Sequence, residues 1–326
     1  MMKKIAVGVI GVGHLGKFHA AKYAAMPEAE LVGVVDLDPD QAARVARDCG
    51  TRPFGDYREL LGQVEAVSVV VPTVHHYQVA RDCLEQGVDI MLEKPMTTTL
   101  EEADRLIALA EAGNRILQVG HIERYNPAVV ALEGLLTRPL FIESHRIHMF
   151  KPRGLDVDVV LDLMIHDIDI ILSIVDSPIS SIHTVGVPVV TPITDIANAR
   201  IIFENGCTAN ITVSRISKDN IRRLRIFQPK SYISVDYGKK SLMMIRLKDE
   251  LNQLGLPQEE IITVALPEQD ALEAELRDFI GNVRERTTPK VSGVQGRMAL
   301  AVAQEIMQQI KDNFSKYRDL IQPPQA

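Results

Sequence analysis

The sequence has few cysteines, no excess of basic residues and no long apolar run, and each of these scarcities argues against a class of binding partner or site. Its three cysteines, Cys49, Cys83 and Cys207, lie far apart and form no CxxC pair, which argues against a disulfide framework or a cysteine zinc site. Basic residues number 36 against 43 acidic ones, so the basic face that nucleic-acid binding requires is not expected. No apolar run approaches the roughly 18 residues of a membrane span. We therefore expect a cytoplasmic protein without metal, nucleic-acid or membrane partners.

The first part of the chain alternates short apolar runs with helical patterns. The runs suit strands of a sheet covered on both faces: Lys4–Ile10, Leu31–Val35, Ala66–Val71, Val88–Leu92 and Ile116–Val119. The intervening segments predict helices: Leu15–Ala25, Pro39–Asp48, His76–Gln86 and Leu100–Glu111. Such alternation is typical of βαβ units. We predict an α/β domain over residues 1–121, a Rossmann-type doubly wound parallel sheet.

The rest of the chain, residues 122–326, has a different rhythm. Strand-like runs follow one another without intervening helices: Ile179–Val187, Ile196–Phe203, Cys207–Ser214, Arg222–Phe227, Ser231–Val235 and Leu242–Leu247. Helices are predicted on either side of them: Pro127–Leu136, Leu161–Val175, Asp270–Glu285 and Gly296–Phe314. This order predicts an α+β domain with an open, mostly antiparallel sheet, for substrate binding and oligomerisation. An open sheet face favours a homodimer or homotetramer, and the C-terminal helix is expected to pack back towards the first domain.

A glycine-rich turn follows the first predicted strand. It reads Gly11-Val12-Gly13-His14-Leu15-Gly16, a G-x-G-x-x-G pattern. The first glycine permits a tight turn, the second lets the backbone approach a pyrophosphate, and the third lets the helix pack on the strand. The helix N-terminus then offers N–H groups to phosphates. The turn predicts a dinucleotide site, to which Gly11, Gly13, His14, Leu15 and Gly16 belong.

Asp36 selects the cofactor. It ends the second predicted strand, twenty residues after Gly16, where the dinucleotide fingerprint has a carboxylate for the adenosine ribose. A carboxylate there repels a 2′-phosphate, and the neighbours Leu37 and Asp38 supply no arginine to accept one. We predict NAD rather than NADP.

Four further segments identify a family. In chain order they are Phe18-His19-Ala20, Val71-Pro72-Thr73-Val74-His75-His76, Glu93-Lys94-Pro95 and Asp162-Leu163-Met164-Ile165-His166. Together with the glycine turn, they make the chain resemble the Gfo/Idh/MocA family of NAD(P)-dependent sugar oxidoreductases. The resemblance spans nearly the whole chain. It implies that Pro72 and Thr73 line the cofactor, that His76 lies near the nicotinamide, and that Glu93 reaches the nicotinamide ribose.

Lys94, Asp162 and His166 are the predicted catalytic residues, and they also bind the substrate. The resemblance implies that Lys94 points at the reacting carbon and its oxygen, aided by a cis bond to Pro95, and that Asp162 and His166 face the nicotinamide. Oxidising a secondary alcohol needs a base for the hydroxyl proton, and the histidine pKa of about 6.5 suits that role. A lysine beside oxidised nicotinamide also favours its neutral form. Either His166 or Lys94 could therefore be the base.

Asp162 and His166 are four residues apart, so they share one face of the predicted helix. Several other acidic residues surround them, and a solvated acidic face is the alternative interpretation: Asp156, Asp158, Asp167 and Asp169. The segment Val157-Asp158-Val159-Val160 also departs from the small residues that relatives often carry there.

The start of the second domain points to a substrate. Residues 120–127 read Gly-His-Ile-Glu-Arg-Tyr-Asn-Pro, which resembles a segment of a family subgroup that oxidises the 3-hydroxyl of UDP-N-acetylglucosamine. The resemblance implies that His121, Glu123, Arg124 and Asn126 lie near the cleft. The planar Arg124 guanidinium suits phosphate oxygens. A surface ion pair between Glu123 and Arg124 is the equally weighted alternative.

The leading hypothesis is an NAD-dependent dehydrogenase of a sugar or nucleotide sugar, with UDP-N-acetylglucosamine as the specific prediction. The subgroup also implies a pathway aminotransferase that uses the ketone product. The alternatives are a dehydrogenase of a free sugar or inositol, an NAD-dependent glycosidase, and a non-catalytic NAD-binding sensor. A sensor is expected to have lost the Lys94 and His166 positions, and both are present.

Overall fold

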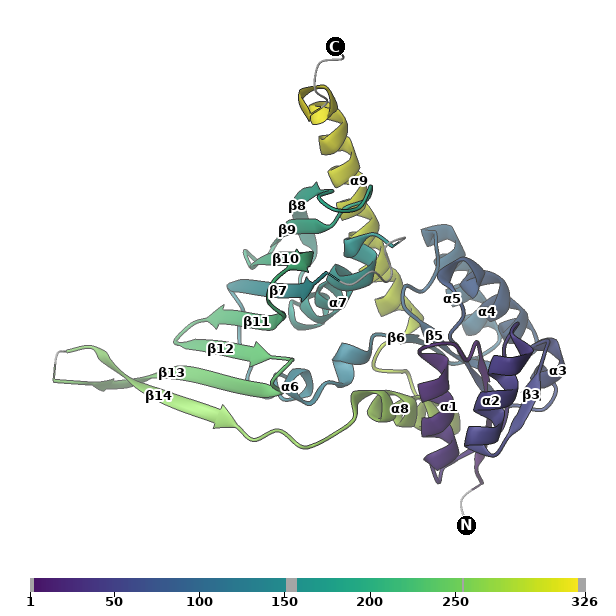
Figure 1. Cartoon of the computed structure of the whole chain (residues 1–326). Helices are drawn as coiled ribbons and strands as arrows, with labels where there is room; N and C mark the ends of the chain where they lie inside the picture. Colours follow the sequence, from purple (N-terminus) through teal and green to yellow (C-terminus); the bar gives the residue numbers. More distant parts are fainter. Residues whose placement is uncertain (1–2, 151–156, 254, 322–326) are drawn as a thin grey trace. The chain divides into compact units, whose positions relative to one another are not determined.

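A computed structural model describes residues 3–150, 157–253 and 255–321 of the chain (Figure 1). Within this described part, no helix combines the length and the apolar character that a bilayer crossing requires. None of the three cysteines forms a disulfide.

The chain divides into two compact units. Unit 1 combines residues 1–125 with 269–300, and unit 2 combines residues 126–268 with 301–326. The chain thus leaves unit 1 a few residues after the predicted boundary at residue 121, and it later returns to that unit. A single boundary along the sequence cannot describe this arrangement, because unit 1 is built from two separate segments.

Unit 1 is built on a six-stranded sheet in which every neighbouring pair is parallel, in the order β3-β2-β1-β4-β5-β6. Its strands are β1 (Ile5–Ile10), β2 (Ala29–Val35), β3 (Arg52–Phe54), β4 (Ala66–Val69), β5 (Asp89–Glu93) and β6 (Leu117–Gly120). The central strands are buried on both faces, which explains their nearly continuous apolar sequences. The predicted Rossmann-type sheet is confirmed, and β3, a three-residue strand at the edge, was not predicted.

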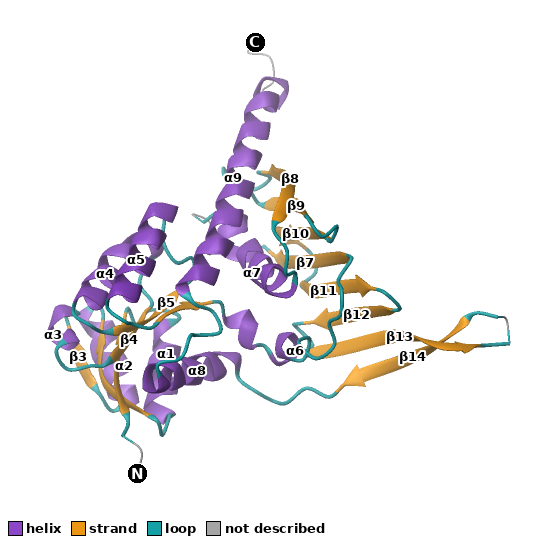
Figure 2. Cartoon of the chain, turned by 180° about the vertical axis from the view of Figure 1, so that it is seen from behind, coloured by secondary structure: helices purple, strands orange, loops and turns teal. Residues whose placement is uncertain are grey.

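Helices cover this sheet. They are α1 (Gly16–Ala25), α2 (Pro39–Cys49), α3 (Arg58–Leu61), α4 (His76–Glu85), α5 (Leu100–Ala112), α8 (Ala271–Glu285) and the first turns of α9 (Gly293–Ile321), with the short 3-10 turns η1 (Thr73–His75) and η2 (Ile122–Tyr125). Helix α8 lies beside α1 (Figure 2) and also contacts β1. Its Leu276, Phe279 and Ile280 share one apolar core with Val7 and Val9 of β1. This burial explains why residues 269–300 belong to unit 1.

Unit 2 is built on an eight-stranded sheet with the order β14-β13-β12-β11-β7-β10-β9-β8. Its strands are β7 (Phe141–Met149), β8 (Ile179–Val187), β9 (Ile196–Phe203), β10 (Thr208–Ser217), β11 (Ile221–Gln228), β12 (Ser231–Asp236), β13 (Ser241–Leu251) and β14 (Pro257–Val264). All neighbours are antiparallel except β7 and β10. The mostly antiparallel sheet predicted for this region is therefore confirmed.

The helices of unit 2 are α6 (Pro127–Val130), the π-helical turn η3 (Val160–Met164), α7 (Ile165–Ile174) and the later part of α9. Both η3 and α7 contact β10. A buried ion pair fastens α7 to the sheet, because Arg146 Nε of β7 donates to Asp167 Oδ2 at 2.8 Å and both side chains are at most 3% exposed.

Two expectations about unit 2 differ from the structure. The helix predicted over Pro127–Leu136 ends at Val130, and the chain continues in tight turns, with Leu135 N–H donating to the Leu132 carbonyl. Gly134 is the residue of segment 131–136 that favours helix poorly, because the other residues there are alanine, leucine and glutamate. Strands β7 and β14 were not predicted. The buried side chains of β7 include Ser144 and Arg146, which hide the apolar alternation of a half-buried strand.

The face of this sheet opposite α7 carries a row of apolar residues. Phe141, Phe227, Tyr232, Ile245 and Ile261 are neighbours in register across β7, β11, β12, β13 and β14. The Phe227 ring centroid lies 5.0 Å from that of Tyr232, and Ile261 is 64% exposed.

Candidate active site

The glycine turn after β1 has the form that its sequence predicts. Gly11 has φ +85°, and a Cβ there would lie 2.7 Å from the Val70 carbonyl oxygen. A Cβ on Gly16 would lie 1.8 Å from the Gly11 carbonyl oxygen, so α1 can pack this closely only without a side chain there. A Cβ on Gly13, in contrast, would meet no atom within 4 Å. The second glycine therefore leaves open space beside the backbone, where a ligand can approach.

A cavity of about 790 Å³ lies along the carboxyl ends of the parallel strands in unit 1. Ten predicted cofactor-binding residues line it: Gly11, Gly13, His14, Leu15, Asp36, Pro72, Thr73, His76, Glu93 and Lys94. The remaining one, Gly16, packs against Gly11 instead. Because the strand order is β3-β2-β1-β4-β5-β6, lining residues that follow β2 and β3 lie at one end, the Asp36 end. Those that follow β5 lie at the other, the Lys94 end.

At the Asp36 end, two backbone N–H groups orient the carboxylate. Oδ2 of Asp36 accepts from Val12 N–H at 2.9 Å, and Oδ1 accepts from Asp38 N–H at 3.0 Å. Asp38 itself caps α2 and does not line the cavity. The carboxylate is thus fixed beside the glycine turn, where it can accept hydrogen bonds from a ribose.

The Asp36 end has a further wall that the sequence did not reveal. Gly55, Asp56, Tyr57 and Arg58, which follow β3, line the same cavity as Asp36. Arg58 is thus an arginine at the Asp36 end of the cavity, where the residues that follow Asp36 in the sequence supply none. Strand β3 is short and partly exposed, so no sequence signal placed this loop beside the glycine turn.

His76, the first residue of α4, joins the loops that follow β4 and β5. Its Nε2 lies 2.8 Å from the Val71 carbonyl oxygen, and its Nδ1 lies 2.9 Å from that of Pro95. Burial lowers the pKa of His76 more than these backbone contacts raise it. The ring lies between the segments that carry Pro72 and Lys94, and in its neutral form its single N–H donates to only one of the two carbonyls. The Lys94–Pro95 bond is cis as predicted.

Glu93 lines the Lys94 end of the cavity. Its Oε1 lies 3.2 Å from His19 Nε2, and its Oε2 accepts from Lys94 N–H at 3.2 Å. Burial raises the pKa of Glu93, but the hydrogen bond and charge of His19, with the charge of Lys94, outweigh it and lower the pKa below its ordinary value. A Cβ on Gly120 would lie 3.0 Å from the carboxylate, so a glycine there leaves Glu93 its space. Glu93 is therefore a fixed anion beside Lys94.

His19 is the residue at this end whose function the sequence did not specify. It lies in α1, is 1% exposed, and holds Glu93 through one ring nitrogen. The other, Nδ1, lies 3.2 Å from Ser68 Oγ, which lies 2.9 Å from Tyr23 Oη. A chain of buried polar groups thus supports the carboxylate from inside the unit. The sequence does carry a signal for this role: His19 follows the G-x-G-x-x-G motif by three residues, on the face of α1 that contacts β4.

Asp162 and His166 lie in unit 2, on one continuous helical segment. Asp162 lies in η3 and His166 in the first turn of α7, and both side chains are partly exposed. The π-helical turn widens the helix at Asp162; such turns are frequent at functional sites. Val159 and Val160 are buried, so these valines of the atypical segment pack in the core of unit 2.

The solvated acidic face is wrong for two of the four aspartates that suggested it. Asp167 is 1% exposed and pairs with Arg146, and Asp169 is 2% exposed. Asp158 accepts from Val160 N–H at 2.8 Å through Oδ1, as a helix cap does. Asp156 lies outside the described residues. The two predicted functional residues, Asp162 and His166, remain partly accessible beside these structural ones.

The segment that carries Arg124 and Asn126 ends unit 1 and begins unit 2. Tyr125 Oη donates to Asp278 Oδ2 of α8 at 2.7 Å, which holds η2 in unit 1. Arg124 lies in η2, and His121 just before it is 1% exposed. Asn126 Oδ1 accepts from Ala128 N–H at 3.1 Å and caps α6. The Asn126 side chain therefore has a structural role, whatever it contributes to a substrate.

The geometry of unit 1 fits a nicotinamide dinucleotide. Open space beside Gly13, a backbone-oriented carboxylate at Asp36, and the Glu93–Lys94 pair at the far end stand in the order that such a ligand requires. Among the described residues no cluster of histidine, cysteine or acidic side chains is arranged to hold a metal ion.

Comparison with known proteins gives two family matches. Residues 5–121 match the oxidoreductase family with an NAD-binding Rossmann fold, GFO_IDH_MocA, and residues 129–233 match a GFO/IDH/MocA C-terminal domain. The chain is 40% identical over 306 residues to the UDP-N-acetylglucosamine 3-dehydrogenase of Acidithiobacillus ferrooxidans, covering 94% of this chain and 97% of that protein. A solved structure of that enzyme superposes with a TM-score of 0.90 and covers 95% of this chain and 99% of its own.

Other relatives are more distant. An inositol 2-dehydrogenase of Rubrobacter xylanophilus is 33% identical over 194 residues, which covers 56% of each chain. Levoglucosan dehydrogenase in complex with NADH is 20% identical, with a TM-score of 0.85, and covers 95% of this chain and 98% of its own. That likeness concerns the fold alone.

Proposed function

The chain belongs to the Gfo/Idh/MocA family of oxidoreductases, as an NAD(P)-dependent enzyme acting on a CH–OH group, and from this premise we propose that it oxidises the 3-hydroxyl of UDP-N-acetylglucosamine with NAD. The carrying observation is the 40% identity to the Acidithiobacillus enzyme over 94% of the chain, which includes most of unit 2. The inositol dehydrogenase of Rubrobacter covers 56%. The myo-inositol 2-dehydrogenase of Thermotoga maritima covers 95% of this chain, but at 25% identity. Substrate residues are expected in unit 2, so the higher identity to the Acidithiobacillus enzyme, over a match that includes most of this unit, favours the nucleotide sugar.

We propose the following roles at the Lys94 end. Glu93 and Lys94 would hold the nicotinamide half of the cofactor, which would supply the acceptor for the hydride of carbon 3 of the sugar. Glu93, fixed by His19, accepts hydrogen bonds from the nicotinamide ribose. His166 takes the proton of the 3-hydroxyl, and Lys94 polarises its oxygen or relays the proton. Asp162, four residues from His166 on one helical segment, orients the sugar.

Arg124 and Asn126 are the proposed substrate contacts at the start of unit 2. The guanidinium of Arg124 has the planar geometry that diphosphate oxygens accept. Asn126, whose side-chain oxygen caps α6, is the proposed contact for a sugar hydroxyl.

NAD is proposed over NADP because Asp36 lines the cavity and its carboxylate is fixed by two backbone N–H groups. Arg58 lines the cavity too, where the carboxylates of Asp56 at 3.3 Å and Asp82 at 3.5 Å offset part of its attraction for a 2′-phosphate.

We further propose that the chain works as a homodimer or homotetramer in the cytoplasm, with an aminotransferase that consumes the 3-keto product. The in-register apolar row from Phe141 to Ile261 on unit 2 supports self-association. Three unpaired cysteines agree with a reducing compartment.

The test is NADH formation across a panel of UDP-sugars, free sugars and inositols. We expect turnover with UDP-N-acetylglucosamine, and none from His166→Ala, which should still bind NAD⁺. Turnover only with inositols would replace the substrate. Release of free sugar from a chromogenic glycoside without net NADH would indicate a glycosidase, and NAD⁺ binding without any turnover would indicate a sensor.

A further inference from the structure

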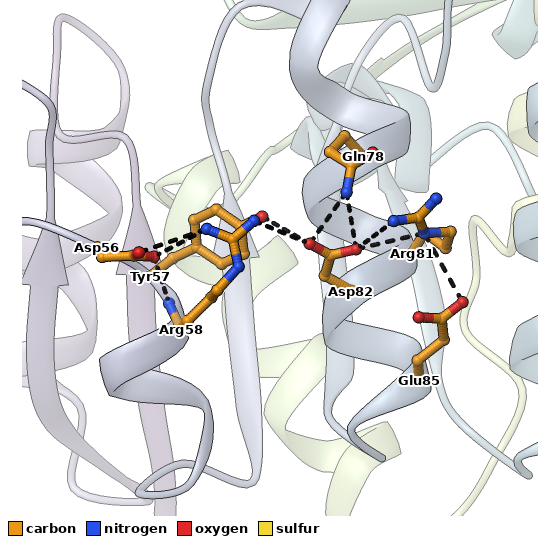
Figure 3. A network of polar contacts seen from close by, with 7 residues as sticks. All are labelled: Asp56, Tyr57, Arg58, Gln78, Arg81, Asp82 and Glu85. Carbon is orange, nitrogen blue, oxygen red and sulfur yellow. Dashed lines mark hydrogen bonds and ion pairs between the residues drawn. The ribbon is translucent and has the colours of Figure 1, made fainter.

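The carboxylate of Asp82 in α4 lies within hydrogen-bonding or ion-pair distance of four side chains (Figure 3). Tyr57 Oη donates to Asp82 Oδ2 at 2.7 Å, and Gln78 Nε2 donates to both carboxylate oxygens, at 2.9 and 3.1 Å. Arg81 Nη2 donates to Oδ1 at 2.8 Å, and Arg58 Nη2 lies 3.5 Å from Oδ2. The carboxylate is thus the common acceptor of two separate segments.

These segments come from different parts of the chain. Tyr57 and Arg58 stand at the start of α3, whereas Asp82 lies in the middle of α4. Tyr57, Arg58 and Gln78 line the cavity, and Asp82 does not. Asp82 therefore acts on the cavity only through the residues that it holds.

The backbone of the wall formed by Tyr57 and Arg58 is anchored by α3, whose Leu60 is fully buried and packs beside Gly8 of β1. Leu60 does not fix the side chains of Tyr57 and Arg58. Helix α3 has four residues, and its N-terminal residue Tyr57 makes no side-chain cap. Arg58 also contacts Asp56, at 3.3 Å, but that residue belongs to the same loop. The contacts with Asp82 connect these two side chains to the long helix α4, so their loss frees the side chains of Tyr57 and Arg58 to move.

The charges of this network are stable near neutral pH. Burial raises the pKa of Asp82, but hydrogen bonds from Tyr57, Arg81 and Gln78 outweigh it, and the pKa is lowered. Burial and the bond to Asp82 raise the pKa of Tyr57 to about 12, so its hydroxyl remains a donor. The Arg58 guanidinium carbon lies 4.8 Å from the centre of the Tyr57 ring, which orients both groups towards one another.

We infer that Asp82 is a positioning residue for the cofactor, because it holds Tyr57 and Arg58 where they contact the adenosine half of the dinucleotide. An aromatic ring and a guanidinium plane are the groups on which a purine base stacks. This inference rests on the proposed binding of NAD in this cavity. It is independent of which sugar is oxidised.

The test measures dissociation constants of AMP and of NAD⁺ for the full chain. Asp82→Ala should weaken both by the same factor, about tenfold, since a hydrogen-bonded charge contributes on the order of 1.4 kcal/mol. Asp82→Asn, whose amide oxygen still accepts from Tyr57, should recover part of the loss. Glu85→Ala is the matched control: Glu85 lies on the same helix, contacts Arg81 at 3.7 Å, and should change neither constant.

Equal loss for AMP and NAD⁺ supports the inference, because the whole effect then lies in the adenosine half. Unchanged AMP binding, or a loss for NAD⁺ several-fold larger than for AMP, overturns it. If Asp82→Ala does not fold, Tyr57→Phe deletes a single bond and should weaken both ligands about threefold. A wild-type chain that binds AMP and NAD⁺ but does not oxidise the nucleotide sugar would refute the proposed function and leave this inference standing.

Discussion

The two ends of the cofactor cavity each depend on a carboxylate, and the two carboxylates are held in different ways. Glu93 and Asp82 have similar exposed fractions, 14% and 16% of the side chain. Glu93 lies deep in unit 1, where its exposed part faces the cavity, and it depends on His19, whose side chain is 2% exposed. Asp82 lies nearer the surface, and its partner Arg58 has a 61% exposed side chain.

This difference indicates that the affinity for the cofactor and the rate of the reaction depend on opposite ends of the cavity. Glu93 cannot lose its buried donor His19 without a cost to the fold, because the place of the 2% exposed His19 side chain is closed to water and Lys94 N–H serves only the other oxygen. An anion near the surface with several donors can lose one, and the consequence is a looser wall rather than an unfolded domain. We therefore expect changes at the Lys94 end to affect turnover and stability, and changes at the Asp36 end to affect cofactor affinity and choice.

The largest effect is expected from Lys94→Met, which keeps the length of the side chain and removes its charge and proton. Turnover should fall by about 1,000-fold, within the range of general acid–base contributions. The dissociation constant of AMP should not change, because AMP occupies only the other end. An end-point assay of NADH formation over several hours measures the turnover, and a separate titration measures the dissociation constant of AMP. Retained turnover would remove Lys94 from the chemistry and would erase the proposed division between the ends.

The next effect is expected from His19→Ala, which leaves the Glu93 carboxylate without its buried donor. The free energy of unfolding at pH 7 should fall by about 3 kcal/mol. The pKa of Glu93 is lowered in the folded chain, so the ionised group stabilises the fold above its ordinary pKa and this stability is lost as the pH falls through the folded value. The difference between wild type and variant should therefore shrink on acidification.

Denaturant unfolding of both proteins at several pH values checks this. Tyr23→Phe is the matched control, since it removes only the hydroxyl that contacts Ser68. It should cost about 1 kcal/mol, independent of pH over this range. Equal, pH-independent losses from both variants would mean that His19 supports Glu93 by packing alone.

A smaller effect is expected from Asp36→Asn at the opposite end. The preference for NAD over NADP should fall roughly tenfold, because the amide no longer repels a 2′-phosphate. Asp38→Asn is the control, since Asp38 caps α2 and does not line the cavity. Dissociation constants of NAD⁺ and NADP⁺ for the three proteins decide the matter. A preference that survives in Asp36→Asn would show that the Asp36 carboxylate does not set the choice of cofactor.

Local patterns predicted most of unit 1 and much of its site. The turn from Gly11 to Gly16 requires close backbone contacts that only glycine permits, so its sequence signals its geometry. Lys94 and His76 lie at the ends of strands or the starts of helices, and the sequence marks those boundaries. The supporting groups were harder to predict, because His19 and Asp82 act on residues more than twenty positions away in the chain.

In unit 2 the missed elements share a physical reason. Strand β7 buries Ser144 and Arg146, and the pair between Arg146 and Asp167 replaces the apolar contacts that a sequence pattern can show. The sequence does not show that Arg146 pairs with Asp167, and without this partner Asp167 resembles a residue of a solvated acidic face. Helix α8 joined unit 1 through Leu276 and Phe279, whose apolar spacing fits a helix in either unit.

The most direct measurement is the initial rate of NADH formation from UDP-N-acetylglucosamine as a function of NAD⁺ concentration, for wild type, Lys94→Met and Asp82→Ala. The account predicts that Asp82→Ala raises the KM for NAD⁺ about tenfold with kcat unchanged, and that Lys94→Met lowers kcat about 1,000-fold with AMP binding intact. A wild-type protein that forms no NADH from this substrate, or an Asp82→Ala variant that loses kcat instead of affinity, would contradict it.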